Sequence, residues 1–334
     1  MTGARQIVVR LHSQRGPLDA EAVARRMPGG SLDHGGVRFT TNPDEDCDVV
    51  VVVNYLKYDS TIFAREGYVW NWHNEPIVRQ PFARGFDRIY THISDSGDPR
   101  VHLAPPILDW WVGKSFDELA AMAVPEKSRN ISAIASTKVD IPGHRRRNDF
   151  IRRLEDSHLP IDIFGHGRER ELADKWEGLA PYRYSITVEN TSKDHYWTEK
   201  IADCFLSYTV PVYFGATDIG EYFPDNSFVW LPLDNAEASV EVVRELLEDD
   251  DWEARLSAVT EARELILRKY SLYGQLTRRV ESERPTIETA DVVQRMVHGR
   301  RTRPGGWIRG LGLSGNIRAR LERRRARRSG RRPQ

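Results

Sequence analysis

A strand, a helix and a second strand follow one another between residues 182 and 216. The first strand, Tyr184 to Val188, is rich in β-branched and aromatic residues and ends at the polar pair Glu189-Asn190. Thr198 then opens a helix whose apolar residues recur at helical spacing: Ile201, Cys204, Phe205 and Tyr208. Residues 210–214 return as a strand that Gly215 closes. This order is the repeating unit of a parallel sheet, so we predict an α/β protein.

Polar side chains gather where such a unit would bind a ligand. Open α/β sheets bind ligands beyond the carboxyl ends of their strands, and these residues fall there: Glu189, Asn190, Tyr196, Glu199 and Lys200. The N-terminus of the helix and the lysine beside it both supply positive potential. We therefore predict a site for a ligand that carries a diphosphate, such as a nucleotide-sugar.

The segment from Tyr182 to Phe228 resembles the donor-binding signature of the α1,3/α1,4-fucosyltransferases, glycosyltransferase family 10. The matching residues are Tyr182, Tyr184, Glu189-Asn190, Tyr196, Thr198-Glu199-Lys200, Val210-Pro211-Val212 and Gly215-Ala216, followed by Asp218, Tyr222, Phe223, Pro224, Ser227 and Phe228. The resemblance implies a GT-B architecture, in which two Rossmann-like domains face a cleft. It also implies an inverting transferase that moves L-fucose from GDP-fucose to a hydroxyl of a cell-surface or lipid-linked glycan.

The resemblance also implies roles for single residues around the donor. Arg147 matches the arginine that contacts the pyrophosphate, and a guanidinium can hold a phosphate through two hydrogen bonds. Lys200 would stabilise charge on the leaving nucleotide, and Glu199 an oxocarbenium-like transition state. Glu189 and Asn190 would contact the ribose and base, although a simple Asx turn is the alternative. The predicted donor-binding residues are Arg147, Glu189, Asn190, Tyr196, Thr198 and Lys200, with Glu199 as a catalytic residue.

A base for the acceptor hydroxyl is expected from the other half of the chain. Glu75 lies at a predicted strand end and matches the family's catalytic glutamate, although the sequence here is Asn-Glu-Pro and lacks the serine of the family's Asn-Glu-Ser-Pro-like segment. Inverting transfer needs such a group to take the acceptor's proton. His73 is the competing candidate because the pKa of a free histidine suits a base. Four tryptophans could stack on sugars or fill the core: Trp70, Trp72, Trp110 and Trp111.

A length of 334 residues predicts two domains. The strand predicted at residues 47–56 contains a run of valines, which indicates a sheet covered on both faces. Further predicted strands are residues 6–12, 67–72, 89–93, 129–135, 161–164 and 227–231, and predicted helices are residues 17–27, 116–123 and 144–158, with a helical region at 236–283. We expect an acceptor-binding domain at 1–112, a linker at 113–128, a nucleotide-sugar-binding domain at 129–283 and a basic tail at 284–334.

No metal or resident cofactor is predicted. The acidic runs at residues 44–46 and 248–251 do not follow strands as a metal-binding loop would, and no Cys/His spacing suggests zinc. Lysine and arginine would neutralise the diphosphate instead. The two cysteines, Cys47 and Cys204, lie in apolar surroundings and are expected to be reduced, buried thiols.

The C-terminal segment is strongly basic. Thirteen arginines against the single acid Glu322 give residues 299–334 a net charge of +12, which leaves −12 on residues 1–298 because the whole chain is neutral. Apolar residues interspersed among the arginines predict contact of residues 300–334 with an anionic membrane surface. A disordered solubilising tail is the alternative, and nucleic-acid binding is the less favoured rival.

The sequence leaves alternatives open for both the location and the function of the protein. No run approaches the eighteen or so apolar residues of a membrane span, and the first residues lead directly into a strand, so we expect a cytoplasmic protein, with peripheral attachment to the inner face of the membrane as the variant that the tail permits. The function could also be transfer from another nucleotide-sugar donor. A non-catalytic glycan- or nucleotide-binding protein with this fold is the alternative outside the enzymes.

Overall fold

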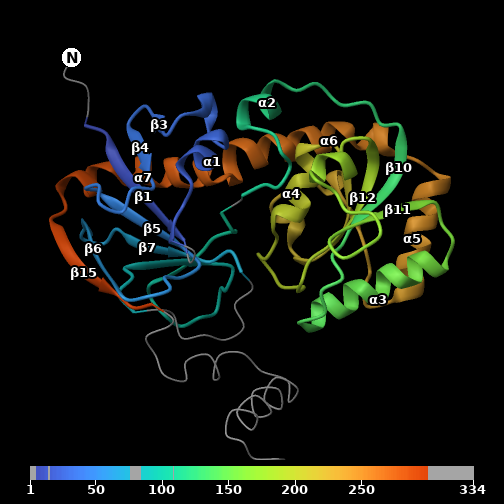
Figure 1. Cartoon of the computed structure of the whole chain (residues 1–334), viewed down its shortest axis with the longest axis horizontal. Coiled ribbons are helices and arrows are strands. Elements are labelled where there is room, and N and C mark those ends of the chain that lie inside the picture. The colour runs from blue at the N-terminus through green and yellow to red at the C-terminus, as the bar shows by residue number, and fades with distance from the viewer. Residues whose placement is uncertain (1–4, 14–15, 76–83, 108, 300–334) are drawn as a thin grey trace, which may run out of the picture.

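Two separate sheets, one in each half of the chain, organise the computed structural model, which describes residues 5–13, 16–75, 84–107 and 109–299 (Figure 1). The first sheet has the order β3 (Asp33–His34), β4 (Val37–Thr40), β1 (Ile7–Ser13), β5 (Val49–Val53), β7 (Val69–Trp72), β8 (Arg88–Thr91) and β9 (Val101–Leu103), with β2 (Gly16–Pro17) paired to β1. The six strands from β4 to β9 in this order are parallel. The strand order reverses direction between β1 and β5, which makes that point the switch point of the sheet.

The valine strand β5 is buried on both faces, as its sequence predicts. Val49 and Val51 belong to one core, to which helix α7 (Leu272–Thr289) contributes Leu276, Val280 and Ile287. Val50 and Val52 belong to a second core under the antiparallel pair of β6 (Ser60–Arg65) and β15 (Val292–Val297). A continuous apolar run is stable here because neither face meets water.

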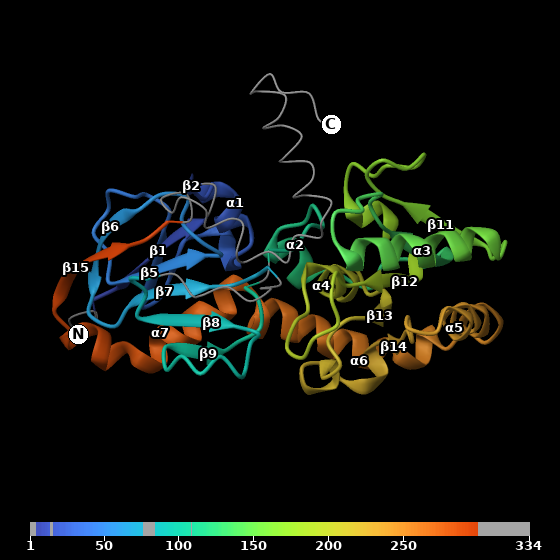
Figure 2. The same cartoon turned by 90° about the horizontal axis from the view of Figure 1, so that it is seen from below.

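The second sheet is parallel throughout and has the order β11 (Ile161–Phe164), β10 (Arg129–Ile134), β12 (Tyr182–Val188), β13 (Val210–Phe214) and β14 (Val229–Trp230). The helices of this half are α3 (Pro142–Asp156), α4 (Glu199–Leu206), α5 (Ala236–Glu248) and α6 (Trp252–Leu265) (Figure 2). Its switch point lies between β10 and β12, because the next strand along the chain, β11, pairs on the other side of β10.

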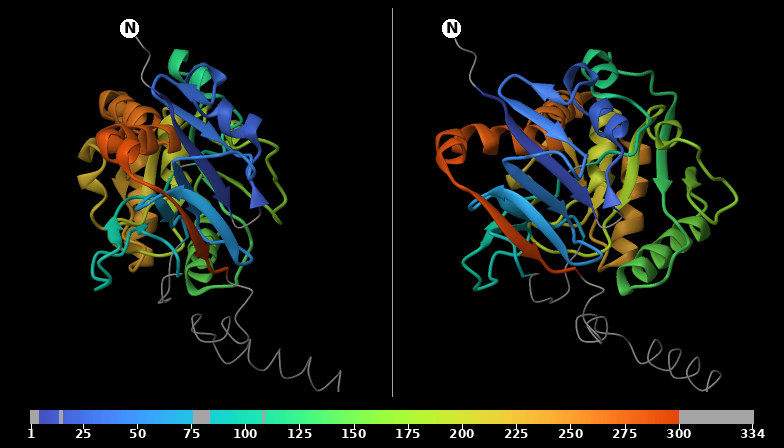
Figure 3. Two further views of the ribbon diagram at one scale, coloured as in Figure 1. Left: turned by 90° about the vertical axis from the view of Figure 1, so that its left-hand side faces the viewer. Right: turned by 60° about the vertical axis from the view of Figure 1, so that its left-hand side comes forward.

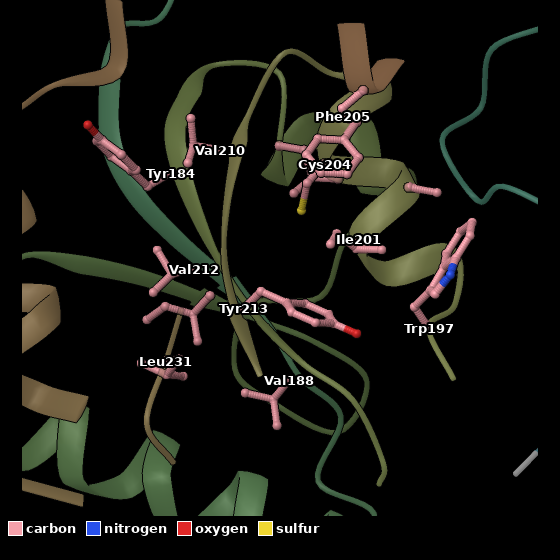
Figure 4. Packing of buried hydrophobic residues seen from close by; sticks show 14 of the residues in the cluster. Tyr184, Val188, Trp197, Ile201, Cys204, Phe205, Val210, Val212, Tyr213 and Leu231 are labelled. Atoms are coloured by element: carbon pink, nitrogen blue, oxygen red, sulfur yellow. The ribbon is translucent and has the colours of Figure 1, made fainter. Parts of the chain in front are cut away.

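Helix α4 packs its apolar face on β12 and β13, as the spacing of its residues predicts. Ile201, Cys204 and Phe205 point into the same core as Val210 and Val212 (Figure 4). Thr198 caps the helix, since its side chain accepts a hydrogen bond from the backbone of Lys200. The core therefore fixes the start of α4 at the carboxyl edge of the sheet.

Several smaller elements complete the described part of the chain. Helix α1 is Ala20–Arg25, and α2 is Phe116–Ala121, which begins with a capping box between Ser115 and Glu118. Four 3₁₀ turns are Pro28–Gly30, Lys175–Gly178, Ile219–Glu221 and Asp225–Ser227, and a π-helical turn is Ile266–Tyr270. Among the described residues, no helix combines the length and apolar character needed to cross a membrane.

The predicted strands at 161–164 and 210–214 have the bounds that the structure shows, and the other predicted strands are present with shifted ends. Six strands were not predicted, because they are short or carry polar residues that break the apolar pattern: β2, β3, β4, β6, β9 and β15. The predicted helix at 17–27 is shortened to α1, since Asp19 caps it.

The end of the chain also differs from the prediction of a tail that begins at residue 284. Helix α7 continues to Thr289, and β15 pairs with β6 beside the first sheet (Figure 3). The domain boundaries remain a prediction, and we propose that residues 272–297 belong with the N-terminal half. The predicted membrane-binding segment, residues 300–334, lies outside the described residues. Both cysteines are free thiols: Cys204 is buried, as predicted, and Cys47 is half-buried.

Candidate functional site

Arg147 lies at the switch point of the second sheet. Its side chain donates to the carbonyl and the hydroxyl of Ser136 after β10, at 3.0 and 3.1 Å, and to Asn190 Oδ1 after β12, at 3.5 Å. Only 7% of the residue is exposed, and its Nε has no hydrogen-bond partner within the described residues. Burial and the positive charge of the neighbouring Arg168 lower the pKa of Arg147, while Glu189 opposes this shift. A negatively charged ligand beside Arg147 would counter both causes of the lowering.

The first turn of α3 approaches the loop after β12 closely enough to exclude a side chain. A Cβ atom on Gly143 would lie 1.7 Å from the carbonyl oxygen of Asn190. Glycine at this position therefore lets α3 deliver Arg147 to the carboxyl edge of the sheet.

Glu189 is at the centre of a buried network on α4. Its carboxylate accepts hydrogen bonds from the backbone N–H and the hydroxyl of Thr198, both at 2.8 Å, and from Lys200 Nζ at 2.7 Å. The Glu189 side chain is fully buried, whereas 23% of the Lys200 side chain is exposed. The predicted pair Glu189-Asn190 thus points in two directions: Glu189 holds the start of α4, and Asn190 faces Arg147.

Tyr196 and Glu199 lie beside this network. Burial opposes ionisation of Glu199, but Lys200 and Lys175 outweigh it and lower the pKa of this carboxyl. Lys175 itself is held by the buried Asp203, with the nitrogen and oxygen 2.8 Å apart. Tyr196 is buried against the ring of His92, which comes from the end of β8, and burial together with nearby carboxylates raises the pKa of its phenol. Because the pKa of Glu199 is lowered, this carboxyl is ionised at neutral pH.

A cavity of about 420 Å³ lies between the two halves of the chain. Glu75 and Glu199 both line it, so the two predicted catalytic carboxylates lie at one cavity although they are far apart in the sequence. Ser13, Val53 and Asn54 line the same cavity, which places it at the β1–β5 switch point of the first sheet. From the C-terminal half, Thr198 and Glu199 at the start of α4 line the cavity, and this segment follows β12 of the second sheet.

The loop that carries Glu75 is fixed by hydrogen bonds that the sequence does not reveal. Asn54, in the left-handed region with φ of 65°, accepts hydrogen bonds through Oδ1 from the backbone N–H groups of Asn74 and Glu75, at 2.8 and 3.2 Å. Asn74 in turn exchanges two hydrogen bonds with the backbone of Ile107. An asparagine that follows a valine strand is the only signal of this arrangement in the sequence, since asparagine tolerates positive φ.

The competing base and three of the four tryptophans lie elsewhere. His73 is buried with its Nε2 2.6 Å from Asn71 Oδ1, and it does not line the cavity. Trp70, Trp72 and Trp110 are core residues. Trp111 is 63% exposed and does line the cavity, which makes it the one of the four that can touch a ligand there.

The acidic runs at residues 44–46 and 248–251 are mostly exposed, and three of their carboxylates form ion pairs: Glu45 with Arg38, Asp250 with Arg183 and Asp251 with Arg255. One group of possible metal ligands, His195, Asp218 and Glu221, has its ligand atoms within 4.8 Å of one another among the described residues. His195 Nδ1 already lies 2.5 Å from Asp218 Oδ2 and 2.9 Å from the Tyr222 hydroxyl. The absence of a metal requirement stays a prediction.

Comparison with solved structures defines the class of fold. A crystal structure of an α1,3-fucosyltransferase with GDP-fucose aligns with a TM-score of 0.52 and 18% sequence identity, covering 87% of this chain and 92% of that one. The two largely parallel sheets, one in each half of the chain, together with this likeness, confirm the predicted GT-B fold.

Comparison with known sequences then defines the family. Residues 124–252 match the model of glycosyltransferase family 10 (fucosyltransferase) C-term, which confirms the resemblance that the residues of this segment predicted. A fucosyltransferase-like protein of Arabidopsis thaliana is 31% identical over 156 residues, which are 46% of this chain and 28% of that protein. The alpha-(1,3)-fucosyltransferase FucT of Helicobacter pylori is 39% identical over 58 residues, which are 17% of this chain and 12% of that protein. The chain thus spans less than a third of these two relatives.

Proposed function

We propose that the protein transfers L-fucose from GDP-fucose to a hydroxyl of a glycan acceptor, with inversion at the anomeric carbon. The proposal is supported by the family of residues 124–252 and by the names of its relatives, which are fucosyltransferases. One observation carries it: Glu75 of the N-terminal half and Glu199 at the start of α4 line one cavity, and Lys200 follows Glu199 directly in the sequence.

The diphosphate would lie against Arg147, Lys200 and the N-terminus of α4. Arg147 has a buried N–H without a hydrogen-bond partner among the described residues, and an anion at the switch point would satisfy it. Both cations would stabilise the negative charge that develops as the bond between the sugar and the diphosphate breaks. They could do this without a metal, as the sequence predicts.

The remaining donor residues would act as contacts or as supports. We assign Asn190 and Glu199 to direct contact with the nucleotide or the sugar, because Asn190 bonds to Arg147 and Glu199 lines the cavity. Tyr196 is buried beside these residues, and we assign it to the wall of the donor site. Glu189 and Thr198 are buried and bonded to each other, so we assign them to positioning Lys200 and the start of α4. Glu189 thus has a different proposed role from the ribose contact that the resemblance implied.

Glu75 is the proposed base. It would take the proton of the acceptor hydroxyl while that oxygen attacks the anomeric carbon, and the diphosphate would leave from the opposite face. Glu75 is exposed at the cavity, whereas His73 is buried away from it, which favours the carboxylate. Glu199, on the donor side of the same cavity, would stabilise positive charge on the sugar ring.

We also propose the two-domain organisation, a cytoplasmic location and contact of residues 300–334 with an anionic membrane surface. The support for the last is the charge of +12 on residues 299–334. Removing residues 300–334 should reduce co-sedimentation with anionic vesicles, and unchanged co-sedimentation would contradict the membrane proposal.

A panel of nucleotide-sugars tests the donor. A ligand that binds only the native state raises the melting temperature, so GDP-fucose and GDP should raise it, and UDP- and CMP-sugars should not. A larger shift with another donor would replace fucose in the proposal. Stabilisation by GDP-fucose without release of GDP in the presence of any glycan acceptor would favour the non-catalytic binding protein.

A further inference from the structure

The N-terminal side of the interdomain cavity has an apolar wall. Strand ends, helix α1 and the loop after β9 supply it, together with the first residue of α7: Leu18, Ala22, Val23, Met27, Val53, Pro106, Ile107 and Leu272. Leu18, Val23 and Leu272 are only partly buried by the core on which they pack. They therefore leave apolar surface facing the cavity.

Most polar side chains of this wall are already engaged within the protein. Asn54 and Asn74 hold the Glu75 loop, as described above. Asp19 caps α1 by accepting a hydrogen bond from Glu21, and Arg26 pairs with Asp109 at 2.6 Å. A fully hydroxylated sugar buried against this wall would find few partners for its hydroxyl groups, which is unfavourable.

Trp111 extends the apolar surface toward the donor side. It is 63% exposed and lines the cavity together with Glu199. Its backbone N–H donates to the buried Asp203 at 2.9 Å, which anchors the residue to α4. An exposed tryptophan held by a buried carboxylate suits stacking against a sugar face or packing against an apolar group.

We propose that the acceptor is amphiphilic: a sugar whose hydroxyl reaches Glu75 and which carries an alkyl or other lipid-like group that packs against Leu18, Val23 and Leu272. This inference rests on the proposed function, because it takes the cavity as the acceptor site. It narrows the acceptor from any glycan to a glycan on an apolar aglycone.

Binding of octyl and methyl β-D-galactopyranoside to the full chain, with GDP present and below the micelle-forming concentration, tests this. Each buried methylene should strengthen binding about fourfold, so the octyl glycoside should bind at least about tenfold more tightly. Equal affinity, or no binding of either glycoside, would overturn the inference. Binding needs no turnover, so it is measured separately from transfer. Preferential binding of the octyl glycoside without fucose transfer would contradict the proposed function but would support an apolar subsite in the cavity.

Matched variants locate the apolar group. Leu18→Ser and the nearly isosteric Val23→Thr should each reduce the preference for the octyl glycoside at least about threefold and leave methyl glycoside binding unchanged. Leu103→Ser is the control, because Leu103 is 47% exposed and does not line this cavity. The stabilisation by GDP checks that each variant folds. A loss of preference in Leu103→Ser equal to that in Val23→Thr would contradict the assignment.

Discussion

The N-terminal and C-terminal sides of the candidate site are built in different ways. On the C-terminal side, the candidate residues come from one helix-starting segment and from Arg147, and buried charges hold them to one another. On the N-terminal side, Glu75 is exposed and its loop is held by neutral hydrogen bonds from Asn54 and Asn74. The comparison teaches that a site for the charged part of a ligand can be encoded largely within one segment, whereas the proposed acceptor side is assembled from separate loops.

Loss of the proposed base should produce the largest effect. Glu75→Gln keeps the size of the side chain but removes the proton acceptor, so kcat should fall by about 10² to 10⁴. GDP binding should not change, because Glu75 belongs to the N-terminal side. Steady-state kinetics and calorimetry measure the two quantities. Glu66→Gln, at an exposed glutamate outside the cavity, is the control. A loss of turnover in His73→Gln but not in Glu75→Gln would transfer the role to His73.

Lys200→Met should affect both binding and stability. The variant removes a proposed diphosphate contact and leaves the fully buried Glu189 without its ion pair. Breaking a buried pair in this way costs about 3 kcal/mol or more of unfolding free energy. Denaturant unfolding should show this loss, and the double variant Glu189→Gln/Lys200→Met should recover part of it. Weak GDP binding in that stable double variant would show that Lys200 binds the nucleotide; full recovery of GDP binding would show that it acts only through the fold.

Asn54→Ala should weaken the N-terminal side alone. The variant removes the oxygen that accepts hydrogen bonds from the Asn74 and Glu75 amides, so Glu75 loses its fixed position. A displaced base should lower kcat between about 10- and 100-fold with little change in GDP affinity. Asn54→Asp keeps the acceptor oxygen and should restore most of the activity. Both asparagine and aspartate tolerate the positive φ of residue 54, so equal losses in the two variants would contradict the positioning role of the Oδ1 hydrogen bonds.

The smallest predicted effect concerns the stability of the protein at low pH, to which the buried His92 beside Tyr196 contributes. Burial, with smaller contributions from Lys193 and His195, lowers the pKa of His92 to about 4 from 6.5. The unfolded chain then binds this proton more readily, so stability falls as the pH falls from 6.5 toward 4. Wild-type protein should lose about 2 kcal/mol more than His92→Phe between pH 7 and pH 5. Parallel stability curves of the two proteins over this range would contradict the prediction.

The sequence predicted the C-terminal side well because most of its candidate residues lie in one contiguous segment, from β12 to α4. Strand β12, the cap at Thr198 and the apolar face of α4 follow from local periodicity, and they place Glu199 and Lys200 at the sheet edge. The burial of Glu189 was not predicted, because an acidic residue at a strand end usually faces solvent. Its partner Lys200 is what makes the burial tolerable.

The N-terminal side was predicted only in part. Glu75 could be named from its short motif, but Asn54, Trp111 and Asp109 come from different loops, and their meeting depends on the strand order. Strand order is a tertiary property that periodicity does not contain. The same reason explains why β15 was missed: it pairs with β6, more than two hundred residues earlier, and has no strong pattern of its own.

The central claim is that Glu75 acts as the base of an inverting transfer. The anomeric configuration of the product, and its dependence on Glu75, test this claim most directly. The chain should be incubated with GDP-fucose labelled at the anomeric carbon and an octyl glycoside acceptor, and the product examined by NMR. We predict a fucoside with the opposite configuration to the donor at the labelled carbon, formed by the wild type and not by Glu75→Gln. A product of retained configuration, or the same rate from Glu75→Gln, would contradict transfer across the cavity with Glu75 as the base.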